Sequence, residues 1–153
     1  MGLLDGKFAI ITGAASPRGL GKATARLFAE HGAIVAILDL DAGQAAAAAA
    51  DLGAEHVGLA CDVTDKEACE TTVAALVGRW GRVDVLVNNA GITQPLKTMD
   101  IGPANYDAVL DVSLRGTLYM SQAVIPTMRA QTSGSIINLS SVSAQRGGGV
   151  FGG

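Results

Sequence analysis

A glycine-rich turn at residues 10–21 is the part of this sequence best suited to hold an anion. The stretch reads Ile-Ile-Thr-Gly-Ala-Ala-Ser-Pro-Arg-Gly-Leu-Gly and lies between an apolar run of strand length at 7–11 and an apolar repeat of helical spacing at 22–31. A strand that turns at glycine into a helix directs backbone N–H groups, with the helix dipole behind them, toward a ligand. The stretch therefore predicts a site for a phosphate or pyrophosphate.

Three glycines in this turn have separate expected roles. Gly13 makes the tight turn, Gly19 lets the backbone approach the ligand, and Gly21 lets the helix lie close to the strand. Their spacing differs from Gly-x-Gly-x-x-Gly, the usual dinucleotide-binding fingerprint. The turn alone therefore leaves open a second interpretation, a glycine-rich turn that binds no ligand.

Polar or glycine-rich residues also follow the other predicted strands. They are Asp39, then Asp62-Val63, then Asn88 to Gly91, and finally Ser140-Ser141. In an open parallel sheet, ligands bind at the carboxyl ends of the strands, near the point where the strand order reverses. Asp, Asn, Ser and Gly also fill ordinary turns, which is the alternative for each position by itself. Their occurrence at successive strand ends favours a single site.

Alternating strand and helix patterns would position these residues. The predicted strands are 7–11, 33–38, 56–60, 83–87 and 135–139, and the predicted helices are 22–31, 42–52, 64–80 and 104–130. The run from Thr64 to Glu67 is interpreted as a capping box that opens the third helix. Short connections between these elements predict an α/β fold with a doubly wound parallel sheet of order 3-2-1-4-5, in one domain over residues 1–153.

Composition excludes several classes of function. The chain has 153 residues, of which 49% are hydrophobic and 4% aromatic, and its net charge of −3 offers no electrostatic basis for binding nucleic acid or an anionic membrane. No apolar run approaches the roughly 18 residues of a membrane span, and 1–7 lacks a hydrophobic signal core. Cys61 and Cys69 are expected to be reduced thiols in the cytoplasm. His31 and His56 lack the spacing of metal ligands, and no metal site is expected.

Taken together, the motifs resemble those of the short-chain dehydrogenase/reductase family. Thr12-Gly13, Gly19-Leu20-Gly21, Asp62-Val63, Asn88-Asn89-Ala90-Gly91 and Ile136-Ile137-Asn138-Leu139-Ser140-Ser141 occur in the order and at the spacing of that family. The resemblance covers the whole chain and favours the single-domain, 3-oxoacyl-reductase-like branch. It implies a three-layer αβα Rossmann fold and an NAD(P)-dependent oxidoreductase that interconverts an alcohol and a ketone by hydride transfer.

The resemblance also implies roles for individual residues. Those expected to bind the cofactor are Gly13, Ser16, Arg18, Gly19, Leu20, Gly21, Asp39, Leu40, Asp62, Val63, Asn89, Ala90 and Gly91. Within this set, the glycines line the pyrophosphate, Asp39 takes the adenosine ribose, Asp62 and Val63 border the adenine, and 89–91 support the central part of the cofactor. Ser141 matches the catalytic serine that holds the substrate oxygen, and it is preferred over Ser140. A turn or helix-cap serine is the alternative for Ser141.

Three departures from the family pattern matter. The glycine loop is two residues longer, around Ser16-Pro17-Arg18, and Pro17 stiffens it. Ser113 stands where the family has an asparagine whose helical carbonyl holds a water of the proton relay, and a serine can bend the helix by bonding back to its own turn. The third departure concerns the general acid, a tyrosine followed at the fourth position by lysine. Tyr106 is followed there by Leu110 and Tyr119 by Ala123.

The given sequence stops at Gly153, before the place where the tyrosine–lysine pair would stand, so we expect a truncated or partial family member that carries the cofactor half. The alternative is a non-catalytic dinucleotide-binding fragment or module. A Rossmann-like methyltransferase, the third class, would explain Asp39 but not Asn88 to Gly91.

Two further expectations concern the cofactor and partners. Asp39 can accept both ribose hydroxyls and would repel a 2′-phosphate, so NAD is expected over NADP, although Arg18 argues the other way. Apart from a small alcohol or ketone substrate, the expected partner is a second copy of the chain, in a dimer or tetramer. In the 104–130 helix, one stripe is predicted to cover the sheet and another to be left for self-association. The first stripe is Val109, Val112, Gly116 and Tyr119, and the second is Leu110, Leu114, Leu118 and Ile125.

Overall fold

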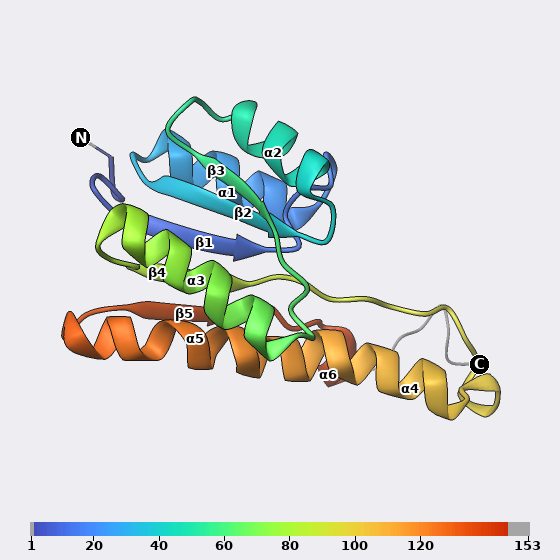
Figure 1. The fold of residues 1–153 in the computed structure, drawn as a ribbon. Helices are drawn as coiled ribbons and strands as arrows, with labels where there is room; N and C mark the ends of the chain where they lie inside the picture. Colours follow the sequence, from blue (N-terminus) through green and yellow to red (C-terminus); the bar gives the residue numbers. More distant parts are fainter. Residues whose placement is uncertain (1, 147–153) are drawn as a thin grey trace.

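Five parallel strands form the centre of the computed structural model, which describes residues 2–146 (Figure 1). The strands are β1 (Phe8–Thr12), β2 (Ile34–Asp39), β3 (Val57–Ala60), β4 (Val85–Asn88) and β5 (Ser135–Asn138). Their order in the sheet is β3-β2-β1-β4-β5, which confirms the predicted doubly wound topology. In the central strand, Ile10 pairs with Ala36 of β2 and Leu86 of β4. The order of the strands reverses at β1 and β4, so the carboxyl ends of these two strands flank the expected ligand crevice.

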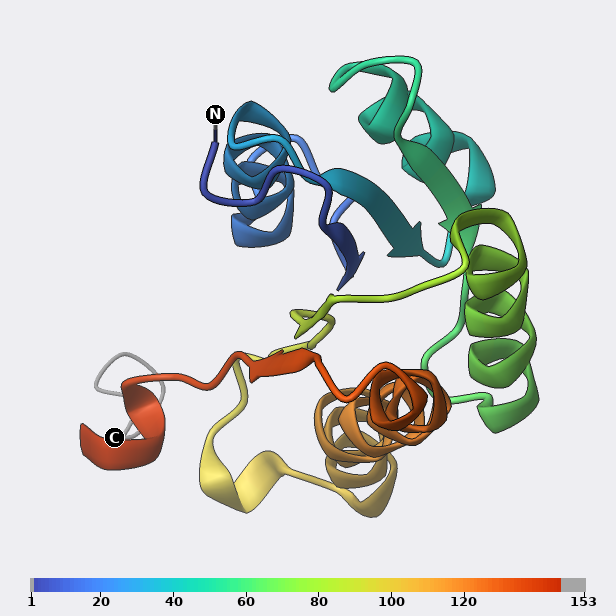
Figure 2. The same cartoon turned by 90° about the vertical axis from the view of Figure 1, so that its left-hand side faces the viewer.

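Helices cover both faces of the sheet (Figure 2). They are α1 (Leu20–Glu30), α2 (Ala42–Ala50), α3 (Lys66–Trp80), α4 (Pro103–Leu110), α5 (Gly116–Ala130) and α6 (Ser143–Arg146), with the short helical turns η1 (Thr98–Asp100) and η2 (Asp111–Arg115). The helices α1 and α2 pack on one face, and α3 and α5 pack on the other. The short helix α6 was not predicted from the sequence. In the part of the chain that the structure describes, no helix is both long and apolar enough to cross a membrane.

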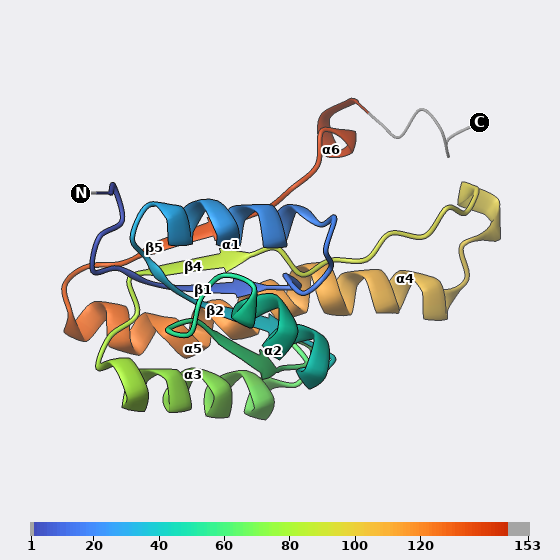
Figure 3. The same cartoon turned by 90° about the horizontal axis from the view of Figure 1, so that it is seen from above.

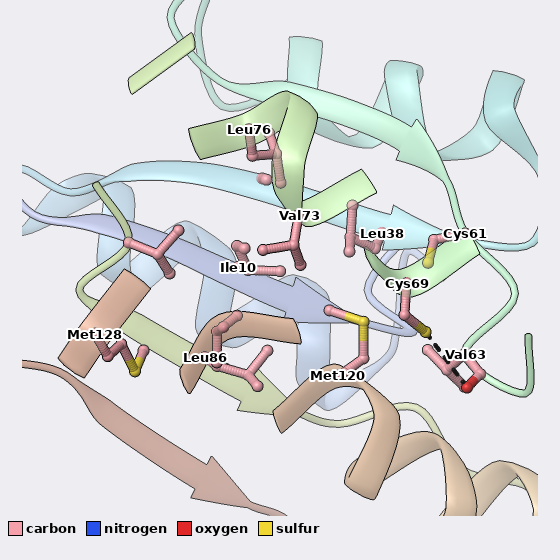
Figure 4. Packing of buried hydrophobic residues seen from close by; sticks show 13 residues of the cluster. Ile10, Leu38, Cys61, Val63, Cys69, Val73, Leu76, Leu86, Met120 and Met128 are labelled. Atoms are coloured by element: carbon pink, nitrogen blue, oxygen red, sulfur yellow. Dashed lines mark hydrogen bonds between the residues drawn. The ribbon is translucent and has the colours of Figure 1, made fainter. Parts of the chain in front are cut away.

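Two apolar clusters lie on opposite sides of the sheet because neighbouring strand residues point to opposite faces. Ile11 of β1 faces the small alanines of α1 and α2, and Ile10 faces α3 and α5. Figure 4 shows the second cluster, in which strand residues meet helix residues: Ile10, Leu38 and Leu86 with Val73, Leu76, Met120 and Met128. Each fully buried side chain of this size contributes roughly 1.5–3 kcal/mol relative to exposure.

The start of α3 differs from the predicted capping box. Asp65, not Thr64, is the N-cap, and its Oδ1 accepts hydrogen bonds from the N–H groups of Glu67 (2.9 Å) and Ala68 (3.1 Å). The Thr64 hydroxyl donates instead to Oδ1 of Asp62 at 2.8 Å. The prediction was wrong because α3 begins one residue later, so that Asp65 occupies the N-cap position and its carboxylate accepts from the first turn.

The predicted helix at 104–130 is continuous in direction but not in type (Figure 3). Between α4 and α5, η2 is a π-helical turn centred on Ser113. Downstream, the Thr117 hydroxyl donates to the Ser113 carbonyl at 2.9 Å and the Ser121 hydroxyl to the Thr117 carbonyl at 2.7 Å. Such bonds back to the preceding turn give carbonyls partners other than the regular helical N–H groups.

The helix covers the sheet partly with the predicted stripe and partly with residues outside it. Of the residues predicted to cover it, Gly116 is buried, Val112 and Tyr119 are half-buried and pack against the core cluster, and Val109 is half-buried. The buried residues of α5 are Gly116, Met120, Val124 and Met128. Met120, Val124 and Met128 continue the stripe from Gly116 at intervals of four residues, beyond the positions that were predicted.

Asp84, just before β4, ties together the chain segments that lead into β1 and β4. Its carboxylate accepts hydrogen bonds from the Phe8 N–H (3.0 Å) and from Nε and Nη2 of Arg82 (2.9 and 2.6 Å), and it lies 3.7 Å from Nζ of Lys7. Burial opposes the ionised form, but the Arg82 and Phe8 hydrogen bonds outweigh it. The pKa of Asp84 is therefore below its ordinary value.

Replacing Asp84 with alanine is expected to lower the free energy of unfolding by roughly 1–3 kcal/mol at neutral pH, because Phe8 and Arg82 lose their acceptor. A depressed folded-state pKa means that the contribution of the carboxylate is fully present above the unfolded pKa of about 3.9 and is lost as the pH falls through the folded-state value. Urea unfolding of the wild type and Asp84→Ala across that pH range should show that the difference between their free energies of unfolding becomes smaller as the pH falls.

The exposed pair of Lys66 and Glu70, 3.2 Å apart one turn along α3, provides the control. Glu70→Gln is expected to change the free energy of unfolding by no more than about 0.5 kcal/mol. A difference between the wild type and Asp84→Ala that stays constant into acid would contradict the assigned role of the ionised carboxylate.

Candidate functional site

A cavity of about 520 Å³ lies where the carboxyl ends of β1 to β4 meet α4 and η2. Ten of the residues expected to bind a cofactor line it: Gly13, Gly19, Leu20, Asp39, Leu40, Asp62, Val63, Asn89, Ala90 and Gly91. These residues come from four different strand ends, and the doubly wound sheet brings all four ends to one edge. The cavity is therefore located where the strand order indicates.

The glycine turn has the backbone geometry of an anion cradle. Gly13 has a φ of +62°, and a Cβ there would lie 2.7 Å from Cα of Ala90. At Gly21, a Cβ would lie 2.5 Å from Nδ2 of Asn89, so a side chain would push α1 away from the end of β4. Gly19 is the N-cap of α1 and supplies no capping side chain. N–H groups in the first turn of α1 are therefore left for a ligand.

A buried hydroxyl joins the ends of β1 and β4. Oγ1 of Thr12 accepts hydrogen bonds from the N–H groups of Asn89 (3.1 Å) and Ala90 (3.0 Å). In return, Nδ2 of Asn89 donates to the carbonyls of Thr12 and Gly13, both at 2.8 Å. The amide of Asn89 thus holds the glycine turn in place. Thr12 was not predicted to have this role, because the role depends on a contact with the chain that follows β4.

Asp39 closes the other side of the turn. Its Oδ2 accepts a hydrogen bond from the Ala15 N–H at 2.9 Å, and its Oδ1 accepts one from the Leu40 N–H at 2.9 Å. Each carboxylate oxygen has a second lone pair, so Asp39 can hold the loop and still accept from ligand hydroxyls. This carboxylate therefore links the conformation of the loop to the rim of the cavity.

Three carboxylates surround the cavity: Asp39, Asp62 and Asp111. Oδ1 of Asp62 accepts from the N–H and the hydroxyl of Thr64 at 2.9 and 2.8 Å. Asp111, in η2, has its Oδ1 2.7 Å from Nη1 of Arg115. Arg115 offsets the charge of Asp111, so Asp39 and Asp62 are the carboxylates that most disfavour an additional phosphate group near them.

Other lining residues were not foreseen: Cys61, Thr64, Ile92, Ala108, Asp111 and Val112. Three of them come from α4 and η2, whose contact with the strand ends is tertiary. Cys61 and Thr64 could have been predicted to line the cavity, because they flank the Asp62-Val63 pair in the sequence.

Three residues expected to bind the cofactor do not line the cavity. Gly21 is buried beneath the glycine turn, against Asn89 and Ala14. Ser16 and Arg18 are exposed on the long part of the loop.

Ser113 is exposed on η2 and lies close to the end of β4: its Oγ is 3.6 Å from the position of a Cβ on Gly91. Nearby, Nδ2 of Asn88 donates to Oγ of Ser121 (3.2 Å) and to Oδ1 of Asn138 (2.9 Å). With the bonds from Ser121 to Thr117 and from Thr117 to Ser113, a polar chain runs from β5 to the π turn. The carbonyl of Ser113 already has the Thr117 hydroxyl as a partner.

Ser141 follows β5 and does not line the cavity. Its exposed Oγ accepts a hydrogen bond from the Ser143 N–H at 3.1 Å, at the start of α6. The side chain therefore performs the turn and cap function that was the alternative interpretation of this serine.

Comparisons with known proteins agree with this geometry. Residues 13–151 match the family described as enoyl-(acyl carrier protein) reductase. The chain is 54% identical over 156 residues to an uncharacterised short-chain type dehydrogenase/reductase of Sinorhizobium fredii, covering 99% of this chain and 61% of that protein. It is 41% identical to the sorbitol dehydrogenase of Cereibacter sphaeroides, covering 97% of this chain and 58% of that enzyme.

A third relative is the 3-oxoacyl-[acyl-carrier-protein] reductase of Thermotoga maritima, 41% identical over 91% of this chain and 57% of that enzyme. The chain thus spans about three fifths of the length of these curated relatives.

Proposed function

Because the chain belongs to the short-chain dehydrogenase/reductase family, we propose that residues 1–153 form the dinucleotide-binding domain of an NAD(P)-dependent oxidoreductase that interconverts an alcohol and a ketone. The observation that supports this proposal most directly is the glycine turn. Gly13 has a positive φ there, α1 lacks a side-chain cap, and the turn lies directly beside the Asp39 carboxylate. A cradle for phosphates next to an acceptor for ribose hydroxyls is what a dinucleotide requires.

In this proposal, the first turn of α1 and Gly19 bind the pyrophosphate and Asp39 accepts the adenosine ribose hydroxyls. Asp62 and Val63 border the adenine, and Ala90 and Gly91 face the central part of the cofactor. The nicotinamide ring, when bound, supplies or accepts the hydride. The protein's part is to hold the dinucleotide at the strand ends and to exclude water.

NADH should raise the melting temperature of the protein, whereas S-adenosylmethionine should not; the opposite result would favour a methyltransferase.

Asp39 supports NAD rather than NADP as the cofactor. The 2′-phosphate of NADPH would approach the carboxylate of Asp39, and Asp62 adds a second negative charge at the same cavity. We therefore expect NADH to bind roughly tenfold more tightly than NADPH, equivalent to about 1.4 kcal/mol of charge repulsion. Asp39→Asn removes the charge, keeps one acceptor oxygen, and should narrow this ratio in fluorescence titrations.

Asp41→Asn is the matched control, because it removes the same charge two residues away at a side chain that does not line the cavity. Asp41 is the exposed N-cap of α2, a position that asparagine also fills well. The ratio should stay unchanged in this variant. Equal or tighter binding of NADPH by the wild type would reject the assignment.

Self-association through α5 and the end of η2 is the proposed quaternary contact. Leu114, Leu118 and Ile125 expose 65%, 52% and 39% of their surface along one side of this segment, whereas Leu110 of the expected stripe is half-buried. An exposed apolar stripe supports an interface between copies. Leu118→Glu is expected to raise the dissociation constant of the oligomer at least about tenfold, because a charge would be buried at the interface.

Sedimentation velocity at micromolar concentration is the measurement. Leu27→Glu is the control, because Leu27 of α1 is also 52% exposed but lies on the other helical layer. A wild type that sediments as a monomer, or equal effects of both variants, would reject α5 as the interface.

A non-catalytic dinucleotide-binding module is the second candidate function. It is favoured by one observation: the hydroxyl of Ser141 is engaged by the Ser143 N–H and lies outside the cavity lining. The buried free thiols Cys61 and Cys69 support a cytoplasmic location for either function.

A further inference from the structure

The π turn η2 forms part of the cavity wall and contacts the loops that follow β3 and β4. Asp111 of this turn lines the cavity, and its carbonyl accepts a hydrogen bond from the N–H of Gly116, five residues along the chain. A Cβ on Gly116 would lie 2.6 Å from Cγ2 of Val63, which follows β3 and is labelled in Figure 4. Oγ of Ser113 lies 3.6 Å from the Cβ position of Gly91, which follows β4. A displacement of the turn would therefore move the cavity wall relative to both loops.

Hydroxyl groups of α5 connect this turn to the sheet. The Thr117 hydroxyl donates to the carbonyl of Ser113 at 2.9 Å, and the Ser121 hydroxyl donates to the carbonyl of Thr117 at 2.7 Å. Oγ of Ser121 also accepts a hydrogen bond from Nδ2 of Asn88 at 3.2 Å. A hydroxyl can donate and accept at the same time, so Ser121 links α5 to the last residue of β4. Because residues 89–91 line the cavity directly after Asn88, Ser121 joins two parts of the cavity lining.

The Asn88 side chain makes this link sensitive to the loss of one hydroxyl. Asn88 is 4% exposed, and its amide nitrogen donates to Oγ of Ser121 and, at 2.9 Å, to Oδ1 of Asn138. Its two N–H bonds thus have two acceptors, and no buried side-chain N or O atom among the described residues lacks a partner. Without the Ser121 hydroxyl, one buried N–H would have no acceptor, which is strongly unfavourable. Water could replace the acceptor, but β4 and α5 would have to move apart to admit it.

We propose that Ser121 is a positioning residue of the cofactor site, which holds the π turn and residues 89–91 at the separation that the dinucleotide needs. Ser121 does not line the cavity itself, so it acts through its hydrogen bonds with Asn88 and Thr117. This inference rests on the proposed function. When the hydroxyl is removed, cofactor binding has to restore the displaced wall, and we expect the affinity for NADH to fall roughly tenfold.

The test is a fluorescence titration with NADH at a temperature where each variant is folded. Ser121→Ala should bind NADH about tenfold more weakly than the wild type, whereas Ser121→Thr keeps the hydroxyl and should bind within about twofold of it. Val124→Ala is the control, because Val124 is fully buried about one turn farther along α5. This variant loses stability through a cavity. Its dissociation constant for NADH should stay unchanged, since a loss of stability alone does not alter binding by the folded protein.

Hydrogen exchange under native conditions tests the link without a ligand. The amides of residues 88–92 and 111–118 should exchange at least about tenfold faster in Ser121→Ala, whereas those of α1 and α2 on the other face of the sheet should keep their rates. Thr117→Val removes the other hydroxyl and leaves Asn88 paired. It carries both measurements if Ser121→Ala does not fold, with changes expected in the same direction.

A wild type that binds NADH and a folded Ser121→Ala with unchanged affinity would overturn the proposal. Equal weakening by Val124→Ala, or no recovery of affinity in Ser121→Thr, would overturn it as well, because the effect would then not come from the hydroxyl. A wild type without measurable NADH affinity would reject the proposed cofactor function, and the exchange rates would still decide whether Ser121 holds the two segments. The two failures are therefore distinguishable.

Discussion

Gly13→Ala is expected to destabilise the protein by about 2–5 kcal/mol and to weaken NADH binding at least tenfold. A non-glycine residue in the left-handed region costs roughly 1–2 kcal/mol. The added methyl group would also lie 2.7 Å from Cα of Ala90, a backbone atom that cannot rotate away, and overpacking of this kind costs about 1–3 kcal/mol more. Relief of the contact would separate β1 from the end of β4, and Thr12 would lose its bonds to Asn89 and Ala90.

Two other glycines separate the causes. Gly6 has a φ of +70° with nothing within 4 Å of its Cβ position, so Gly6→Ala should show the backbone cost alone. Gly78 lies inside α3, also with open space around its Cβ position, and Gly78→Ala should stabilise the protein by roughly 0.5–1 kcal/mol. Urea unfolding and NADH titration of all three variants give the comparison. A Gly13→Ala variant that resembles Gly6→Ala would show that close approach to Ala90 has no energetic importance.

The parallel pairing of the sheet was predictable because its inner strands are continuous apolar runs that alternate with helices. A run such as 33–38 can be buried only in a strand covered on both faces, and alternation with helices then requires parallel pairing. The predicted strand boundaries differ from the observed ones where a polar residue belongs to a strand. Thr12 was assigned to the turn, but it is a buried residue of β1 whose hydroxyl binds two N–H groups of the chain beyond β4.

The π turn could not be predicted in the same way. Residues 111–115 have the apolar spacing of an ordinary helix, and nothing local distinguishes a π turn from an α turn. Its stabilising partners, Thr117 and Ser121, follow it in the chain, and Ser121 in turn binds Asn88 of β4. A polar contact with the sheet therefore accompanies the change from α-helical to π-helical bonding.

For the site, sequence spacing predicted which strand ends line the cavity but not what the side chains there do. Asp39 was expected at the rim, yet its bond to the Ala15 N–H depends on how the long loop folds back. Asp111 lies on a helix and carried no strand-end signal. Ser141 was identified from its motif, and its bond to Ser143 follows from α6, an element too short for a periodic pattern to show.

A polypeptide of residues 1–153 is expected to bind NADH but to reduce ketones about 10²–10⁴-fold more slowly than a complete relative, because reduction needs a proton donor at the developing alkoxide. Neither tyrosine has a lysine at the fourth following position. Tyr106 is 59% exposed on α4, and Tyr119 is half-buried against the core of α3 and α5. The Ser141 hydroxyl can hydrogen-bond an oxygen, but it is a poor proton source near neutral pH.

The assay follows NADH oxidation by residues 1–153 with small ketones and 3-oxoesters, at cofactor concentrations that saturate the titrated site. The sorbitol dehydrogenase of Cereibacter sphaeroides, 41% identical to this chain, is the positive control with its own substrate pair. Saturation with cofactor is needed because it distinguishes the lack of a proton donor from weak cofactor binding. Holding the bound reactants in the right orientation also supplies a large part of the lowering of the activation barrier. Turnover comparable to that of the control would show that the acid has been misassigned. Tyr106→Phe and Tyr119→Phe would then identify the donor, since only the true acid loses activity when its hydroxyl alone is removed.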